Sequence, residues 1–206
     1  MMKLQNGIMK KILIYGSKEF AQVVKDLMSQ TGLPFTGFID DFNTGDGILG
    51  DFEYIRNNYP PDSYEIAVAI GYKDLKARWS VCQKILNAGY KSPTIIHPRA
   101  YVRDPESVGR GVIIMAGAVV DMYCKIGDFA VLWPGVVVAH HSVIGANTFL
   151  SPNCTVCGSV TVGHGCFIGA GSIIVDHNDV PSESFVKAGQ RYYRSGRKGN
   201  VSKADM

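Results

Sequence analysis

Aliphatic residues recur at every sixth position through the second half of the chain. The series runs from Val102 to Val180 without an exception. A helix requires apolar spacing near 3.6 residues and a lone strand alternates with a period of two, so a period of six fits neither. It is typical of short parallel strands joined by tight turns and stacked coil upon coil, each coil burying its aliphatic residues against the next.

Two further features follow the same period. The residues two before each aliphatic position are mostly small, and three of the five cysteines, Cys124, Cys154 and Cys166, occupy such positions. We therefore interpret the cysteines as packing residues rather than ligands or disulfide partners. Glycine follows the aliphatic residue at intervals of 18 residues, at Gly109, Gly127, Gly145 and Gly163. Eighteen residues are three hexads, so this spacing predicts coils with three faces. Residues 102–180 would then form four to five coils.

The first third of the chain lacks the six-residue period and alternates between apolar runs and helical spacing. We expect strands over 11–16, 34–41, 65–71 and 94–96, and helices over 19–31 and 73–87. This alternation predicts a small parallel α/β sheet, in which ligands bind beyond the carboxyl ends of the strands. Those ends carry Gly16-Ser17, Asp40-Asp41 and Gly71, but no G-x-G-x-x-G motif, so support for a dinucleotide is weak.

Three segments follow from these patterns: an α/β domain over 1–98, a repeat domain over 99–190 and a basic tail over 191–206. The net charge of +3, from 21 Lys and Arg against 18 Asp and Glu, gives no reason to expect nucleic acid. No apolar run is long enough to span a membrane. The five cysteines and the lack of a secretory signal pattern favour a cytoplasmic protein.

The chain from about residue 10 to residue 191 resembles a known family, the hexapeptide-repeat sugar acetyltransferases of the sialic acid O-acetyltransferase and bacillosamine N-acetyltransferase type. The resemblance rests on the hexads and on these motifs: Ile14-Tyr15-Gly16, Gly37-Phe38-Ile39-Asp40-Asp41, Val68-Ala69-Ile70-Gly71, Ile96-His97-Pro98 and His140-His141-Ser142-Val143-Ile144-Gly145. It implies a Rossmann-like α/β domain followed by a left-handed parallel β-helix. It also implies an acetyl-CoA-dependent acyltransferase acting on a nucleotide-linked amino sugar or a sialic acid-type sugar, a homotrimer without a metal, and a role in cell-surface polysaccharide biosynthesis.

The resemblance places His140 at the position of the family's catalytic histidine, the general base that takes the proton of the attacking amine or hydroxyl. An imidazole is largely neutral at cytoplasmic pH and suits this role. His141 follows it, where the family commonly has an acidic residue that orients the base. The resemblance assigns acetyl-CoA to Gly158, Gly169, Ala170 and Lys187, and the sugar nucleotide to Gly16, Ser17, Asp40, Asp41, Gly71 and Trp133.

Other positions depart from the family pattern. Trp133 stands where the family has a small amide residue, and Phe149 stands where the family has a second histidine. Glu19 lies in a loop where a bound phosphate would favour the backbone N–H groups of glycines. Trp133 either fills a gap between subunits or forms a wall of the acceptor pocket. The departures leave open a catalytically weakened or inactive trimeric scaffold as the alternative.

A zinc hydrase like the γ-class carbonic anhydrases is a weaker alternative. His141 and His177 are 36 residues apart and share one face, but two strand spacings separate them by roughly 9.6 Å, too far for one zinc ion within a chain. The histidine expected five residues beyond His177 is Ser182.

Outward-pointing apolar residues next to the aliphatic stripe predict a trimer interface. They are Val119, Val131, Val137, Val143, Phe149, Phe167 and Ile173. We interpret the basic tail as a solvated segment, and the alternative is a clamp on the phosphates of CoA.

Overall fold

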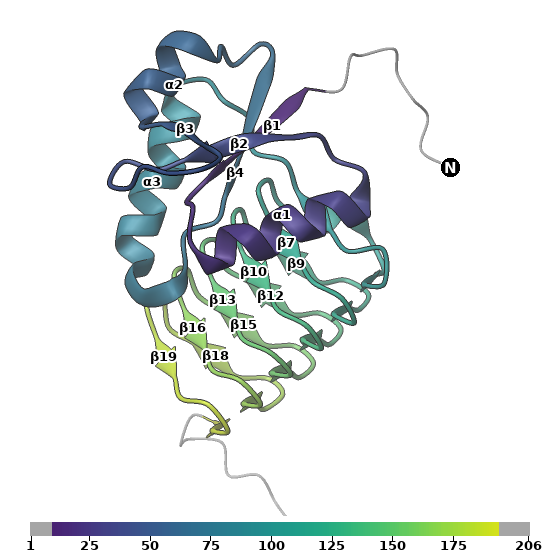
Figure 1. Ribbon diagram of the computed structural model, residues 1–206. Coiled ribbons are helices and arrows are strands. Elements are labelled where there is room, and N and C mark those ends of the chain that lie inside the picture. Colours follow the sequence, from purple (N-terminus) through teal and green to yellow (C-terminus); the bar gives the residue numbers. More distant parts are fainter. Residues whose placement is uncertain (1–9, 194–206) are drawn as a thin grey trace, which may run out of the picture.

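The aliphatic hexads form the interior of a β-solenoid, and the first third of the chain folds into a small α/β domain that lies on one face of it (Figure 1). This arrangement comes from a computed structural model, which describes residues 10–193. The predicted fold class, a parallel α/β domain followed by a left-handed β-helix, is confirmed. The first nine residues and the tail from residue 194 onward lie outside the described part.

The α/β domain contains a four-stranded parallel sheet in the order β3-β2-β1-β4. Three expected strands and both expected helices are present. The bounds are β1 Lys11–Tyr15, α1 Glu19–Thr31, β2 Phe35–Ile39, β3 Ile48–Gly50, α2 Phe52–Asn58, β4 Tyr64–Val68, the 3-10 turn η1 Tyr72–Asp74 and α3 Leu75–Asn87.

The sequence did not predict β3 and α2. The helix α2 has seven residues and buries only Phe52 and Ile55, so it shows too little of the helical period to be recognised. Its start is fixed locally, because the side chain of Asp51 caps it by accepting a hydrogen bond from the backbone N–H of Tyr54.

The strand expected over 94–96 exists but belongs to the other domain. It is β5 (Ile95–Ile96), and it pairs in parallel with a strand of the solenoid rather than with the α/β sheet. Placing it in the α/β sheet was wrong. The solenoid therefore begins before residue 98, and its first strand lies inside the range we assigned to the α/β domain.

The solenoid has three faces, each a parallel ladder whose neighbouring strands lie 18 residues apart, as the glycine spacing predicted. With six, six and four strands it makes about five coils. Face 1 contains β5, β7 (Ile113–Ile114), β10 (Val131–Leu132), β13 (Phe149–Leu150), β16 (Phe167–Ile168) and β19 (Phe185–Val186). Face 2 contains β6 (Tyr101–Val102), β8 (Val119–Val120), β11 (Val137–Val138), β14 (Thr155–Val156), β17 (Ile173–Ile174) and β20 (Arg191–Tyr192). Face 3 contains β9 (Lys125–Ile126), β12 (Val143–Ile144), β15 (Thr161–Val162) and β18 (Asp179–Val180), and the short helix η2 (Pro105–Ser107) precedes it.

The predicted packing role of the cysteines agrees with their burial. Cys124, Cys154 and Cys166 are buried in the solenoid core, and all five cysteines are free thiols. Burial raises the pKa of the Cys154 thiol to about 12, which keeps it protonated and unreactive.

The turns between faces contain a regularity that the sequence analysis missed. Every sixth residue from Gly111 to Gly189 has a positive φ, and eight of these residues are not glycine. The left-handed conformation is costly for most side chains. The non-glycine members are Tyr123, Phe129, His141, Asn147, Asn153, Ser159, His177 and Glu183.

The glycines spaced by 18 lie where successive coils touch. A β-carbon added to Gly145 would lie 2.4 Å from the carbonyl carbon of Gly163 in the next coil, and one added to Gly127 would lie 2.5 Å from the amide nitrogen of Ala146. Both obstacles are backbone atoms, which cannot rotate away. Glycine is therefore required at these positions by the close stacking of the coils.

The α/β domain packs on face 1 (Figure 1). The ring of Phe20 on α1 stacks on Trp133, at 5.5 Å between centroids, and meets the edge of Phe149 at 5.9 Å. Val131 and Phe149 are buried there, 0% and 3% exposed. The structure thus contradicts the prediction that these two residues form a subunit interface, because their own α/β domain covers them.

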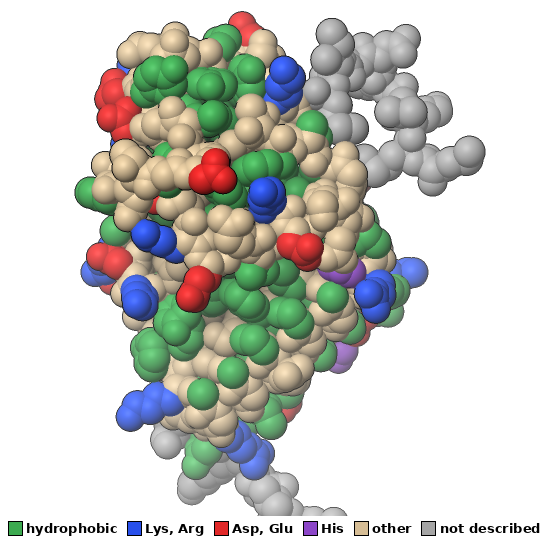
Figure 2. All heavy atoms as spheres, viewed as in Figure 1, with side chains coloured by type: hydrophobic (Ala, Val, Ile, Leu, Met, Phe, Trp, Pro, Cys, Tyr) green, Lys and Arg blue, Asp and Glu red, His purple; other side chains and the backbone are tan. Residues whose placement is uncertain are grey.

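Toward its end, face 1 is left uncovered. Figure 2 shows hydrophobic side chains gathered on the solenoid below α1. The rings of Phe149, Phe167 and Phe185 form a stacked series along this face, and Phe185 is 65% exposed. A cleft of about 530 Å³ lies beside them, between the solenoid and the start of α3.

A buried arginine connects the two domains. Arg78 on α3 is 0% exposed and donates hydrogen bonds to the carbonyl oxygens of Ile70 and Phe129 and to the side-chain oxygen of Asn147. Asn147 also donates to the carbonyl oxygen of Leu75, at the start of α3. Because a buried charge without partners is very costly, this network fixes α3 to the solenoid turn.

We expect the substitution Gly145→Ala to destabilise the protein by about 1–3 kcal/mol, because the added methyl group overpacks the backbone of the next coil. Thermal unfolding monitored by circular dichroism measures the effect. Gly71→Ala is the matched control, since an added β-carbon there meets no atom within 4 Å and its φ is not positive. Equal melting temperatures for the two variants would contradict the close-packing argument.

Candidate functional site

His140 and His141 lie on the turn between β11 on face 2 and β12 on face 3. Both side chains are exposed. Their Nδ1 atoms are 3.1 Å apart, and the two ring planes are nearly perpendicular, at 84°. Among the described residues this is the only hydrogen bond that either ring makes. Within residues 10–193, the Nε2 atom of His140 makes no hydrogen bond.

The coils on either side hold this pair of histidines. The His140 ring lies against the α-carbon of Gly158, where a β-carbon would come within 2.6 Å of its Cε1 atom. The backbone N–H of Ser159 donates to the His140 carbonyl oxygen at 2.9 Å. From the preceding coil, Tyr123 packs its ring on His141 with 4.8 Å between centroids.

The sequence analysis did not single out Tyr123 as a site residue. The signal was available, because Tyr123 precedes His141 by one 18-residue coil and both occupy the left-handed turn position.

A second candidate group lies at the carboxyl ends of β1 and β2. The Ser17 hydroxyl donates to Asp40, and the other oxygen of Asp40 accepts from the backbone N–H groups of Phe42 and Asn43, at 3.0 and 2.9 Å. Burial raises the pKa of Asp40, but the hydrogen bonds from Ser17, Asn43 and Phe42 lower it by more, so the pKa lies below its usual value. The carboxylate thus fixes the loop after β2, and the loop presents the ring of Phe42, 95% exposed.

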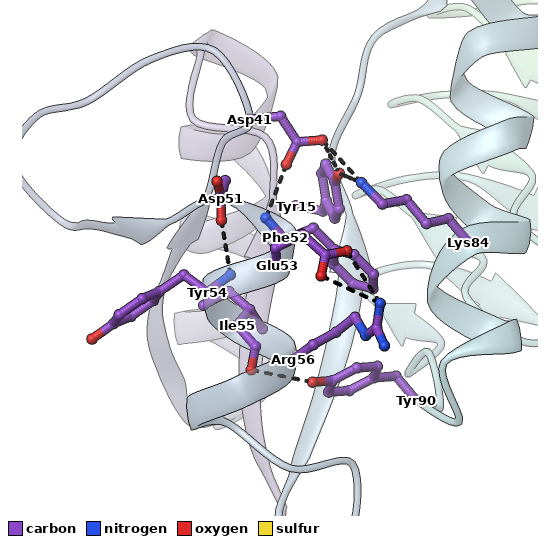
Figure 3. Close-up of polar contacts among 10 residues, drawn as sticks. All are labelled: Tyr15, Asp41, Asp51, Phe52, Glu53, Tyr54, Ile55, Arg56, Lys84 and Tyr90. Atoms are coloured by element: carbon purple, nitrogen blue, oxygen red, sulfur yellow. Dashed lines mark hydrogen bonds and ion pairs between the residues drawn. The ribbon is translucent and has the colours of Figure 1, made fainter.

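The carboxylate of the neighbouring Asp41 also binds groups of the protein itself (Figure 3). It accepts hydrogen bonds from the Tyr15 hydroxyl at 2.6 Å and from the backbone N–H of Phe52 at 2.9 Å, and it pairs with Lys84 at 3.1 Å. Burial raises the pKa of Asp41, and these partners lower it by more, giving a net decrease. The pKa of Tyr15 shifts in the opposite direction, since burial and the hydrogen bond to Asp41 both raise it.

Gly16 and Gly71 have different roles in the backbone. Gly16 has φ +113, and a β-carbon on it would lie 2.7 Å from the carbonyl oxygen of Ala69, so the packing of β1 against β4 requires glycine whether or not a ligand binds. Gly71 precedes η1 in open space and has no such constraint.

The residues assigned to acetyl-CoA fall on two different turns. Gly169, Ala170 and Lys187 lie together on the turn between faces 1 and 2, where Gly169 packs closely against the backbone of Lys187 and Ala188. Gly158 lies with His140 on the turn between faces 2 and 3. The structure therefore does not bring the four residues together within one chain.

Trp133 lies between α1 and the solenoid, packed on Phe20 and Phe149. It is half-buried, and its indole N–H has no hydrogen-bond partner among the described residues. Its contacts are thus with its own α/β domain. Trp133 and Phe149 are therefore part of the contact between the two domains of one chain.

The two candidate groups are on opposite sides of one chain. The α/β domain covers face 1, whereas His140 is on the turn between faces 2 and 3. No group of three or more His, Cys, Asp or Glu side chains within residues 10–193 is arranged to hold a metal ion. None of the helices in this range is long and apolar enough to cross a membrane.

We expect Asp41→Asn to destabilise the protein at pH 7 by roughly 1–2 kcal/mol, since it removes a charged hydrogen-bond acceptor. The pKa of Asp41 is lower in the folded protein than the value of about 3.9 in an unfolded chain. The stabilisation is therefore complete above that unfolded value and is lost as the pH falls through the folded one. Urea unfolding of wild type and variant between pH 3 and pH 7 measures this.

The difference in unfolding free energy between wild type and Asp41→Asn should shrink toward the acid end. Asp62→Asn is the control, because Asp62 is exposed and makes no hydrogen bond within residues 10–193. A difference that stays constant over the whole pH range would contradict the role of the ionised carboxylate.

Comparison with known proteins identifies both domains. Residues 11–85 match the PglD N-terminal domain, and residues 123–158 and 141–176 match the bacterial transferase hexapeptide repeats. None of the curated protein sequences matches the chain.

Solved structures match both domains together. The acetyltransferase domain of PglB from Neisseria gonorrhoeae superposes with a TM-score of 0.80 at 27% identity, covering 87% of this chain and 89% of that one. The same domain in complex with acetyl coenzyme A gives a TM-score of 0.79 at 26% identity, covering 87% and 89%. PerB from Caulobacter crescentus, in complex with CoA and GDP-perosamine, gives 0.69 at 26% identity, covering 90% and 96%. The chain thus combines a PglD N-terminal domain with hexapeptide repeats, and over most of its length it is similar in structure to acetyltransferases that have been solved.

Proposed function

We propose that this protein transfers the acetyl group of acetyl-CoA to a nucleotide-linked amino sugar or a sialic acid-type sugar, with His140 as the general base. The observation that carries the proposal is the His140 imidazole, held on Gly158 with Nε2 free at an exposed turn of the solenoid. Structures similar along the whole chain support the two substrates, since PglB was solved with acetyl coenzyme A and PerB with CoA and GDP-perosamine.

In this reaction the acceptor nitrogen attacks the thioester carbonyl carbon while Nε2 of His140 takes the proton. The carbon–sulfur bond then breaks, and the His140 imidazolium gives its Nε2 proton to the departing sulfur, so that CoA leaves as the thiol and the base is restored. Backbone N–H groups of the turn are suited to steady the oxyanion, as fixed dipoles do in other acyl transfers. The chemistry requires no cysteine nucleophile, which agrees with the burial of Cys124, whose thiol donates a hydrogen bond to the carbonyl oxygen of Ala139 beside this turn.

Acetyl-CoA would contact Gly158 beside the base, and Gly169, Ala170 and Lys187 along a second turn. The sugar nucleotide would bind at Gly16, Ser17 and Gly71. Because their carboxylate oxygens are already occupied, Asp40 and Asp41 would shape that binding loop rather than contact the nucleotide directly.

The separation of the two groups supports a trimer in which the active site is shared. A sugar nucleotide at the strand ends of one copy lies away from its own His140, so the base must come from another copy. Face 2 is the candidate interface, since its outward side chains are mostly apolar: Tyr101, Val119, Val137 and Ile173. A closed three-fold assembly would bury this face.

The alternative function, an inactive scaffold, is favoured by the replacement of the family's acidic residue by His141. The exposed Glu19 at the start of α1 is a second replacement near the expected phosphate position.

We expect His140→Ala to lower the acetyl transfer rate by about 100- to 10,000-fold, because it removes the general base. Release of the CoA thiol from acetyl-CoA, measured against a panel of UDP- and GDP-linked amino sugars that includes GDP-perosamine, tests this. Tyr54→Phe is the control, since it changes an exposed hydroxyl on α2, outside face 2 and the turn that carries His140. Wild-type rates in the His140 variant would remove it from the mechanism, and a wild type that neither transfers nor binds acetyl-CoA would favour the scaffold.

For the assembly, sedimentation at micromolar protein should give the mass of three chains. Ile173→Asp should dissociate it, because it places a charge on the apolar face 2, where Ile173 is 45% exposed. Thr161→Asp makes the equivalent change on face 3 and should leave the trimer intact. A monomeric wild type, or equal behaviour of the two variants, would overturn this interface.

A further inference from the structure

We propose that Phe185, Lys187 and Arg191 bind the nucleotide end of the acyl donor, so that the enzyme selects acetyl-CoA over thioesters that carry only the pantetheine arm. This inference rests on the proposed function and deepens it, because the contacts proposed so far leave the adenine ring of CoA without a partner. Its starting point is an aromatic ring left uncovered at the end of a stack.

The outward rings of face 1 form a ladder that follows the stacking of the coils. Phe149 and Phe167 are stacked with 6.1 Å between centroids and 20° between planes, and Phe167 and Phe185 with 4.8 Å and 14°. The strand β19 is the last of face 1, and within residues 10–193 no other ring packs on Phe185. The ladder therefore ends in a ring that is 65% exposed, on which a further planar ring can stack.

Space for such a ring lies beside the ladder. Phe167 and Phe185 line the cleft of about 530 Å³ between the solenoid and the start of α3. Every nucleobase has a π-face, so a base gains binding energy by stacking on an aromatic side chain without hydrogen bonds to its edge. The end of the ladder thus suits adenine, the base of CoA.

The charges around this ring suit phosphate groups. Lys187 follows the ring by two residues, and Arg191 begins β20 on the other side of the same turn; both are exposed, and neither forms an ion pair within residues 10–193. The turn is fixed by a hydrogen bond from the backbone N–H of Lys187 to the side-chain oxygen of Gln190, at 3.2 Å. Glu183, the carboxylate nearest to the ring in sequence, pairs with Lys76 at 2.8 Å, which offsets its charge. Two cations are therefore available to the pyrophosphate and the 3′-phosphate of CoA.

The distance along the solenoid agrees with the length of CoA. Phe185 follows His140 by 45 residues, or two and a half coils, which is about 12 Å along the axis at the spacing of parallel strands. The arm of CoA between the thiol and the pyrophosphate is about as long as four extended residues, roughly 14 Å. In a trimer of parallel solenoids the same axial distance separates the ladder end from the base of a neighbouring copy. A thioester held at the base thus brings the adenine to the end of the ladder.

A site for the nucleotide makes the choice of donor depend on a part of CoA that does not react. Binding energy from such a remote group helps to capture and orient the thioester. A thioester on a pantetheine arm without the nucleotide, such as that of a carrier protein, would reach the base but lack this contact. The enzyme should therefore use acetyl-CoA in preference to acetyl-pantetheine.

Calorimetry with CoA, adenosine 3′,5′-bisphosphate and pantetheine tests the site without an acceptor sugar. Phe185→Ala should weaken binding of CoA and of the bisphosphate about 5- to 100-fold and leave pantetheine unchanged, because it removes only the stacking surface. Phe185→Trp should retain binding, since indole offers a larger face. Arg191→Ala should weaken CoA binding and reduce its dependence on salt.

Tyr54→Ala is the matched control, because it removes an exposed ring on α2, 49% exposed, and should leave CoA binding unchanged. Melting temperatures identify any variant that fails to fold. Equal CoA affinities in wild type, Phe185→Ala and Arg191→Ala would overturn the inference. An equal loss for CoA and pantetheine in Phe185→Ala would also overturn it, since the ring would then contact the arm.

These outcomes are separable from those of the proposed function. A protein that binds CoA through Phe185 but acetylates no sugar would overturn the proposed function and leave this site in place. A loss of transfer in His140→Ala, together with a CoA affinity independent of Phe185, would support the proposed function and overturn this inference. In an active enzyme, Phe185→Ala should lower kcat/KM for acetyl-CoA by the same factor as the affinity and leave kcat/KM for acetyl-pantetheine unchanged; equal losses for the two donors would contradict a nucleotide site.

Discussion

The close stacking of the coils is the constraint on which the rest of the structure depends. Neighbouring strands repeat every 18 residues on all three faces, and the coils approach so closely that the glycines at Gly127 and Gly145 cannot carry a side chain. This register sets the neighbours of every exposed residue without a loop being needed to position it. The His140 imidazole rests on Gly158, and Tyr123 rests on His141, because each pair is separated by one coil.

The same stacking limits how the two candidate sites can cooperate. The α/β domain takes up face 1, where its Phe20 packs on Trp133 and Phe149, whereas His140 is on the turn between faces 2 and 3. In the proposed mechanism, copies of the chain therefore complete one another. The apolar face 2 and the turn that carries His140 are adjacent, so the proposed interface would place a neighbour beside the base.

Much of this architecture could be predicted from the sequence, because a period of six residues shows directly which side chains point into the core of the solenoid. The three-faced coil, the packing cysteines and most of the α/β strands and helices followed from periodicity. Features that depend on contacts between distant segments did not. From the sequence, Trp133 was expected in a pocket or a subunit interface, whereas in the structure Phe20 covers it. Likewise, β5 was expected in the α/β sheet, which lies nearer in sequence. The hydrogen-bond partners of Asp40 and Asp41 also come from segments distant in sequence, and no local pattern shows that these segments come together. The residues with positive φ between Gly111 and Gly189 share a position in the coil but not a residue type, so composition does not identify them.

Arg78 has a consequence for how this protein can diversify. Its guanidinium is buried without a carboxylate and donates hydrogen bonds to oxygens from both domains, so separating the domains would break its bonds to Phe129 and Asn147. The α/β domain is thereby fixed to the solenoid as a rigid attachment rather than a swinging arm. Under the proposed function, substitutions in its exposed loops, such as the one that presents Phe42, would alter which acceptor is bound without changing the contact between the domains. On that proposal, a change of acceptor requires substitutions in a single loop and leaves the junction at Arg78 intact.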